Sequence, residues 1–287
     1  MTPIHNGLQK VGLYLRAAYA TRSFNWRGLP FVPKRLSITL PHNRAAYNEF
    51  LLWIRQSLRL RDANVVFDVG ANHGDFSKAA SECFPRARIF LFEPLPVLRP
   101  LLESEVARHA NRWQFYPIAL GAADGHLPFH IDPVNDTIGS FAGFSNSYRK
   151  LHDNLGDIQN TRTIEVPIAS LDNFCQRTGI EHIDLIKIDV EGFEFAVLEG
   201  ATKILANTSA VIVETSLSRT AGGSPKPLQD ILIQLTQSGF YIVGLFPMFS
   251  HDEHQQGRPC EYNVLARRFD KNPRQQRNVS TDERFLH

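Results

Sequence analysis

The stretch between residues 65 and 75 constrains the fold of this chain more than any other. It reads Val-Val-Phe-Asp-Val-Gly-Ala-Asn-His-Gly-Asp, the pattern of a buried strand, a glycine-bearing turn and the start of a helix. A second apolar stretch, 89–92, ends in an acid, Glu93. In α/β proteins this combination holds a nucleoside, because the strand-end acid accepts hydrogen bonds from the ribose hydroxyls. The sequence therefore predicts a nucleoside pocket at one edge of a sheet.

Strand and helix patterns alternate along most of the chain. Strands are predicted at 65–69, 88–92, 113–120, 183–190, 210–214, 240–246 and 261–269, with shorter ones at 127–131 and 163–166. Helical periodicity is predicted after Asn43, after Gly74, around Leu102, at 171–178, around Val197 and at 228–238. This alternation favours a doubly wound, mostly parallel, seven-stranded sheet. No helical pattern separates the last two strands, so a hairpin should place one antiparallel strand at the sheet edge.

Composition and charge indicate one folded domain with basic ends. The chain has 287 residues, of which 43% are hydrophobic, enough for a full α/β core. Residues 1–62 hold ten Lys or Arg against two acids, and 267–287 hold six against three. We expect a basic N-terminal arm with capping helices at 1–62, the nucleoside-binding domain at 63–269 and a basic tail at 270–287. The basic ends are expected to be solvated, with peripheral contact to an anionic membrane as the alternative; no nucleic-acid-binding signature accompanies them.

Cysteine usage and hydropathy favour a cytoplasmic protein. Cys83, Cys175 and Cys260 lie far apart, which argues against a disulfide framework and favours a reducing compartment. No apolar run approaches the roughly 20 residues of a membrane span. Residues 8–19 are interrupted by Lys and Arg and lack the apolar core of a signal peptide.

Two polar segments interrupt the alternation. Residues 132–162 are rich in Asn, Asp, Ser and Gly, and a stretch this long is expected to be either a substrate lid or a tolerated excursion. His251 and His254 belong to a second polar segment, where exposed side chains are expected rather than metal ligands.

The glycine turn favours a nucleoside ligand without phosphates. Gly70 and Gly74 frame it, but it lacks the middle glycine of the dinucleotide fingerprint and the Lys-Ser/Thr pair of a triphosphate loop. S-adenosylmethionine is a common ligand that meets this description. A plain strand–helix turn is the alternative, which Glu93 disfavours.

A second group of acids ends the strand at 183–190. Alternating Ile residues bury this strand, so Asp189 and Glu191 are expected at its carboxyl end, where ligands bind in open parallel sheets. Two acids there could bind a sulfonium or amino group, position a hydroxyl, or accept its proton. A helix cap is the alternative for Asp189. Glu194 is expected to face solvent in the first turn of the next helix, where the helix dipole favours an acid.

Several segments share their order and spacing with one known family. They are Phe67–Gly74, Phe92–Pro94, Ala119–Gly121, Leu171–Phe174, Ile183–Gly192 and Val211–Glu214. On these residues, over roughly 65–215, the chain resembles the FkbM-type S-adenosylmethionine-dependent methyltransferases. The Lys-Ile-Asp-Val-Glu-Gly segment together with Gly-Ala-Asn-His-Gly is the most specific part of the resemblance.

The resemblance implies a fold and a set of site residues. The fold is the class I methyltransferase fold, which is Rossmann-like, and the activity is methyl transfer to a hydroxyl of a sugar, glycolipid or secondary metabolite. The implied cofactor residues are Asp68, Gly70, Ala71, Asn72, Gly74, Glu93, Leu120 and Asp189. The implied catalytic residues are Asp189, Glu191 and Glu214. One departure is Ala122, where the family often has an acid; Asp124 follows two residues later.

Three alternatives stay open. Asp189 and Glu214 end adjacent strands, where a divalent metal could bind, although a metal is not favoured. The chain could also be a catalytically silent nucleoside-binding regulatory or scaffold protein. A nicotinamide-dependent oxidoreductase is disfavoured by the missing middle glycine.

Overall fold

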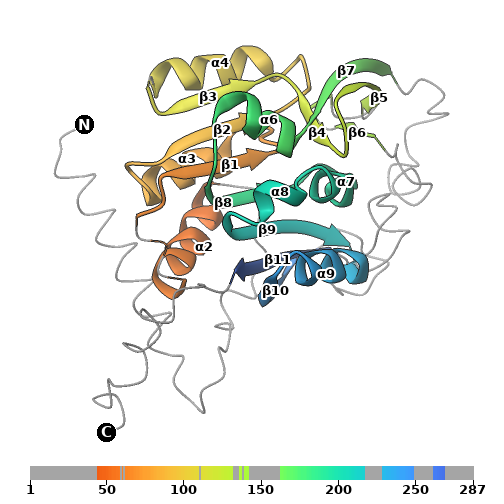
Figure 1. Ribbon diagram of the computed structural model, residues 1–287. Helices are drawn as coiled ribbons and strands as arrows, with labels where there is room; N and C mark the ends of the chain where they lie inside the picture. Colours follow the sequence, from red (N-terminus) through yellow and green to blue (C-terminus); the bar gives the residue numbers. More distant parts are fainter. Residues whose placement is uncertain are drawn as a thin grey trace, which may run out of the picture.

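The computed structural model describes residues 44–58, 60, 62–109, 111–131, 136–137, 139–141, 162–216, 228–248 and 261–268. A seven-stranded sheet in the order β10-β11-β9-β8-β1-β2-β3 lies at the centre (Figure 1). Its members are β1 (Val65–Val69), β2 (Arg88–Phe92), β3 (Trp113–Tyr116), β8 (Ile183–Ile188), β9 (Thr208–Ser216), β10 (Phe240–Met248) and β11 (Glu261–Arg268). β3, β2, β1, β8 and β9 run parallel. The predicted doubly wound, mostly parallel sheet is confirmed.

Apolar residues on both faces of the parallel strands explain why helices cover the sheet on two sides. Within β1, Val66 packs into one core, whereas Val65, Phe67 and Val69 pack into the other, because successive strand side chains point to opposite faces. The first core is completed by α2 (Arg44–Ser57), α3 (Asp75–Cys83) and α4 (Arg99–Arg108). The second is completed by α6 (Leu171–Thr178), α7 (Glu194–Glu199), α8 (Thr202–Leu205) and α9 (Leu228–Gln237).

The predicted hairpin of the last two strands is confirmed at one end of the sheet, and its antiparallel strand lies next to the edge. β11 inserts between β9 and β10 and pairs antiparallel with both, which leaves β10 at the edge. Burial agrees with the inner position: Val264, Leu265 and Ala266 of β11 are completely buried, whereas Leu245 of β10 is exposed. The centre of β11 is covered on both sides, as expected of a strand with two neighbours.

The predicted strand at 113–120 is two strands in two sheets. β3 ends at Tyr116, and β4 (Ala119–Gly121) joins a second, four-stranded sheet in the order β4-β7-β5-β6. Pro117 separates the two, because proline lacks the N–H that a continuous ladder needs. The other members are β5 (Gly125–Ile131), β6 (Gly139–Ser140) and β7 (Thr163–Ser170). Two of its strands, β5 and β7, correspond to the two short predicted strands and are longer than predicted. This sheet also forms one wall of the site.

Several expectations fall outside the described residues. These are the N-terminal arm before residue 44, most of the polar stretch 132–162, the segment with His251 and His254, and the tail after residue 268. The described part of the N-terminal region, α2, lies in the same core as the sheet, with Tyr47 against Phe76 of α3 and Phe50 against Phe246 of β10. No helix in the described ranges is long and apolar enough to cross a bilayer.

Candidate active site

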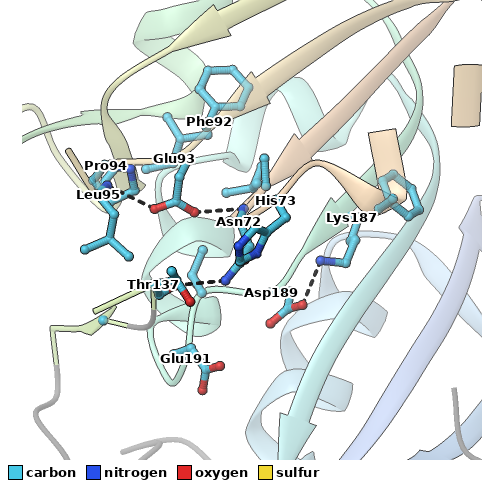
Figure 2. A pocket seen from close by; sticks show the side chains of 18 of the residues that line it. Asn72, His73, Phe92, Glu93, Pro94, Leu95, Thr137, Lys187, Asp189 and Glu191 are labelled. Carbon is cyan, nitrogen blue, oxygen red and sulfur yellow. Dashed lines mark hydrogen bonds and ion pairs between the residues drawn. The ribbon is translucent and has the colours of Figure 1, made fainter. Parts of the chain in front are cut away.

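A cavity of about 330 Å³ opens at the carboxyl ends of β1, β2 and β8 (Figure 2). Residues from seven places in the chain line it: Tyr47, 69–73, 75–76, 92–95, 118–120 with Phe129, Thr137 with Gly139 and Phe141, and Lys187 with 189–191. Parallel strands end at the same edge, so the turns that follow them converge there. Of the predicted site residues, the structure brings Gly70, Ala71, Asn72, Glu93, Leu120, Asp189 and Glu191 together on this cavity.

The turn after β1 is held by its neighbours on both sides. Gly70 and Ala71 donate their N–H groups to the carbonyl of Phe92, each at 3.0 Å. Gly70 adopts φ +77°, and a Cβ there would lie 1.8 Å from the carbonyl oxygen of Asp189. The glycine at this position therefore allows the turns after β1 and β8 to touch, which closes the floor of the cavity.

Glu93 is fixed at the end of β2 by two backbone donors. Its Oε2 accepts from the N–H of Asn72 at 2.9 Å, and its Oε1 accepts from the N–H of Leu95 at 3.0 Å (Figure 2). The side chain is buried, and burial raises the pKa of Glu93 to about 7 although both N–H groups favour the charged form. The carboxylate is thus presented to the cavity in one orientation.

The most unusual group of the cavity is Lys187, which the sequence analysis did not select. It belongs to β8, is only 3% exposed, and its ammonium lies 2.7 Å from Oδ2 of Asp189. Burial opposes the charge, but Asp189, Tyr47 and Asp68 outweigh burial and raise the pKa of Lys187 well above its usual value. The sequence did indicate this residue, because Lys187 stands between two isoleucines of a buried strand. At such a position a charge without a partner costs too much free energy.

A short segment around β6, Thr137 with residues 139–141, closes one side of the cavity; we refer to it as the strap. The side chain of Asn72 donates to the carbonyl of Thr137 at 3.0 Å, and Ser140 Oγ donates to the carbonyl of Glu191 at 2.7 Å. Asn72 (φ +46°) and Glu191 (φ +51°) both have the left-handed backbone that is uncommon outside glycine. The strap therefore holds two ligand-side turns in conformations that they would not prefer alone.

Aromatic rings give the strap its apolar face. Phe141 packs at 4.8 Å from Phe129 and at 4.5 Å from Phe193, as measured between ring centroids. A Cβ on Gly139 would lie 2.1 Å from the ring of Phe129, so glycine is needed for this packing. Phe129 and Phe141 line the cavity, and sequence reasoning missed them because they lie in the interval without helix–strand alternation.

Glu194 does not face solvent, which corrects the sequence-based expectation. It is 4% exposed, and its Oε1 accepts from the N–H groups of Val190 at 3.2 Å and Gly192 at 2.9 Å. Burial raises its pKa to about 7, and these donors lower it. The physical reason is that the turn after β8 exposes backbone donors toward the interior, and the first acid of α7 satisfies them.

Three predicted residues do not line the cavity. Asp68 is completely buried beneath it, where Oδ2 accepts from Ser77 Oγ at 2.6 Å; burial raises its pKa to about 6 while Lys187 and Ser77 lower it. Gly74 precedes α3 with φ +75°. Glu214 lies on β9, where Val213 pairs with Ile188, so it neighbours Asp189 on adjacent strands.

The acids near this edge do not assemble into a metal site in the described ranges, where no group of three or more His, Cys, Asp or Glu side chains could hold a metal ion. Asp124, which stands near the position where the family often has an acid, points elsewhere. It accepts from the N–H of Ser170 and from Arg177, and these partners lower its pKa to about 2. Asp124 therefore fixes the junction of β7 and α6.

The lining is rich in negative charge. Among the described lining residues, the acids are Asp75, Glu93, Asp189 and Glu191, and Lys187 is the only lysine or arginine. Apolar side chains of Leu95, Ile118 and Leu120 also line the cavity. The cavity thus combines a fixed carboxylate, apolar lining residues and further acids, and acids such as these stabilise a cation.

The doubly wound sheet, with one reversed strand next to its edge and the buried acid Glu93 directly after its second strand, has the class I methyltransferase fold. The particular family follows from comparison of sequences. The chain belongs to the family described as Methyltransferase FkbM domain, which matches residues 68–243. This confirms the resemblance inferred from the motifs.

Two characterised relatives and one solved structure illustrate the similarity. The 2-O-methyltransferase NoeI of Sinorhizobium fredii is 30% identical over 187 residues, which cover 64% of this chain and 74% of NoeI. The 31-O-demethyl-FK506 methyltransferase FkbM of Streptomyces tacrolimicus is 30% identical over 192 residues, which cover 56% of this chain and 72% of that protein. The magnesium protoporphyrin IX methyltransferase ChlM from Synechocystis, solved with bound SAM, is 12% identical, with a TM-score of 0.45 over 91% of each chain.

Proposed function

We propose that this protein transfers a methyl group from S-adenosylmethionine to a hydroxyl oxygen of a sugar, glycolipid or secondary metabolite. The observation that carries the proposal is the division of one cavity into two ends, with Glu93 at the first and Asp189 with Glu191 at the second (Figure 2). Membership of the FkbM methyltransferase family supports the methyl transfer. The names of NoeI and FkbM support oxygen as the methylated atom.

The residues present fit S-adenosylmethionine. The fixed carboxylate of Glu93 would hold the ribose hydroxyls, and Leu95, Ile118 and Leu120 would contact the adenine. The turn at 70–72 would contact the methionine part. When bound, S-adenosylmethionine supplies a methyl group on a positively charged sulfur, and the acids of the lining favour such a cation.

The chain's own residues would orient the acceptor and take its proton. An alcohol is a weak nucleophile, so a carboxylate that accepts its proton assists the attack. Asp189 is the carboxylate best suited to this role, because its hydrogen bond to Lys187 fixes its orientation at the cavity. Glu191, which is exposed at the rim, would bind a second hydroxyl of the acceptor, and the rings of Phe129 and Phe141 would exclude water.

Titration calorimetry with S-adenosylhomocysteine and, separately, with NAD tests the cofactor. We expect S-adenosylhomocysteine to bind and NAD to show no heat, because a lining with four acids disfavours a diphosphate. Binding of NAD alone would favour an oxidoreductase. Binding of neither would contradict the proposal.

Transfer of a tritiated methyl group into a cell extract tests the reaction. After fractionation, label is expected in the lipid, polysaccharide or small-molecule fraction. Binding of S-adenosylhomocysteine without any transfer would favour a silent scaffold. A parallel reaction with a chelator addresses the divalent-metal alternative, and we expect no loss of transfer.

A further inference from the structure

Beneath the proposed acceptor end of the cavity, one buried cation lies between two carboxylates. Lys187 Nζ is 2.7 Å from Asp189 Oδ2 and 4.0 Å from Asp68 Oδ1. At the first distance Lys187 donates a hydrogen bond to Asp189, whereas at the second it forms an ion pair with Asp68 without a hydrogen bond. Asp68 and Lys187 are 0% and 3% exposed, so both charges are shielded from water.

The second carboxylate, Asp68, has one oxygen that could accept a further hydrogen bond. Oδ2 of Asp68 accepts from Ser77, but Oδ1 is buried and has no hydrogen-bond partner among the described residues. A buried carboxylate oxygen without a donor is costly, and native structures rarely keep one without a reason. An ammonium has three N–H donors, so a small rotation of Lys187 would bring one of them to Oδ1.

Aromatic rings hold the ammonium in the position between the acids. Lys187 Nζ lies 5.7 Å from the ring centroid of Tyr47 and 5.8 Å from that of Phe76. These rings attract a cation without favouring either carboxylate, so they allow the ammonium to shift. Tyr47, on α2, also acts on this cluster electrostatically, as do three further groups: Glu214 of β9, Glu93 directly after β2, and Glu194 of α7.

We propose that Lys187 and Asp68 are positioning residues that form a two-place charge switch beneath Asp189. Lys187 pairs with Asp189 before the reaction and shifts to Oδ1 of Asp68 when Asp189 becomes protonated. This deepens the proposed function and rests on it. In the balanced step, the acceptor O–H bond breaks and its proton goes to Asp189. The oxygen uses its electron pair to bond the methyl carbon, and the C–S electron pair stays on sulfur.

The switch matters because the reaction removes the charge that Lys187 pairs with. An ammonium left buried without a counter-ion is strongly destabilised, and this would oppose protonation of Asp189. Asp68 supplies the alternative partner within 4.0 Å, so the cluster keeps one ion pair before and after the proton moves. The sequence motif implied Asp68 as a cofactor residue, and its place beneath the cavity instead suits this supporting role.

A crystal structure of the Asp189→Asn variant tests the switch without any substrate. The amide imitates a protonated Asp189 in shape and charge, and Asp189 is partly accessible, so the variant is expected to fold. Lys187 Nζ should then lie at about 3 Å from Asp68 Oδ1. Lys187 remaining on the side chain at position 189 would overturn the proposal. Glu191→Gln, which removes a charge from the same cavity, is the control and should leave Lys187 on Asp189.

Thermal unfolding gives a second readout. Asp68→Asn should lower the Tm more in the Asp189→Asn background than in the wild type, because only there does Lys187 donate a hydrogen bond to Asp68. Equal losses in the two backgrounds would overturn the switch. Both measurements can be made whether or not S-adenosylhomocysteine binds, so a failure of the proposed function can be distinguished from a failure of the switch.

In an assay of methyl transfer, Asp68→Asn should lower kcat about tenfold or more and leave the affinity for S-adenosylhomocysteine unchanged. A purely structural role of Asp68 would lower both.

Discussion

Among single residues, Glu93 is the one whose contribution to cofactor affinity can be isolated by an isosteric change. Its two oxygens each accept from a backbone N–H, and glutamine offers only one oxygen and one NH₂ group. In Glu93→Gln, one backbone donor would lose its acceptor, as would one ribose hydroxyl in the proposed cofactor site. We expect S-adenosylhomocysteine affinity to weaken by about 1–3 kcal/mol, measured by calorimetry. Glu103→Gln, an exposed change on α4, is the matched control; unchanged affinity in Glu93→Gln would mean that the ribose lies elsewhere.

A substitution of Asp189 should affect the rate of methyl transfer and the affinity for the cofactor differently. The Asp189→Asn amide cannot take the acceptor's proton, so the kcat for methyl transfer should fall by about 10²–10⁴-fold. Affinity for S-adenosylhomocysteine should change little, since Glu93 and the turn at 70–72 remain. Initial rates and calorimetry on the same preparation check this. If affinity falls as far as kcat, Asp189 supports the cofactor site rather than the reaction.

At the scale of elements, the start of α7 holds the turn that presents Asp189. Glu194 satisfies two N–H groups with a single oxygen, so Glu194→Gln can keep both bonds. Glu194→Ala removes the acceptor and should lower the free energy of unfolding by about 1–3 kcal/mol for each N–H. Urea unfolding at pH 8 measures both variants, with Glu199→Ala at the exposed end of α7 as control. Equal loss in the Gln and Ala variants would contradict this account.

Elements also show where sequence reasoning succeeds and where it stops. β1, β2 and β8 were predictable because each is a mostly apolar run with a polar residue or glycine after it. The division at Pro117 and the inner place of β11 depend on which strands compete for neighbours, and periodicity does not report that. Lys187 was not selected and Glu194 was wrongly expected in solvent for one reason: a charged residue in the sequence does not reveal its buried partner. The partner of Lys187 is Asp189, and those of Glu194 are two backbone N–H groups.

At the scale of the whole molecule, buried acids predict how stability depends on pH. Burial raises the pKa of both Glu93 and Glu194 to about 7, above the value of about 4.5 for a solvated glutamate, and Asp68 shifts in the same direction. An acid whose pKa is raised by folding stabilises the protein below its unfolded pKa, and this contribution is lost as pH rises through the folded pKa.

The free energy of unfolding should therefore fall between pH about 4.5 and about 7, with a slope of up to ~1.4 kcal/mol per pH unit for each group. Denaturant titrations at several pH values measure the slope. Glu194→Gln should flatten it. Asp124→Asn is the control, because the pKa of Asp124 is lowered to about 2 and its contribution is lost only below the tested range. A wild-type slope of the opposite sign would show that these acids are charged at low pH.

The inserted strand has a consequence for how this protein is made. β11 follows every other strand of the large sheet in chain order, yet it is the strand that joins β9 to β10. While the chain is still being synthesised, β10 has no partner in that sheet until β11 leaves the ribosome. The edge of β10 therefore has no partner in that sheet during this interval, when an unpaired strand edge favours aggregation.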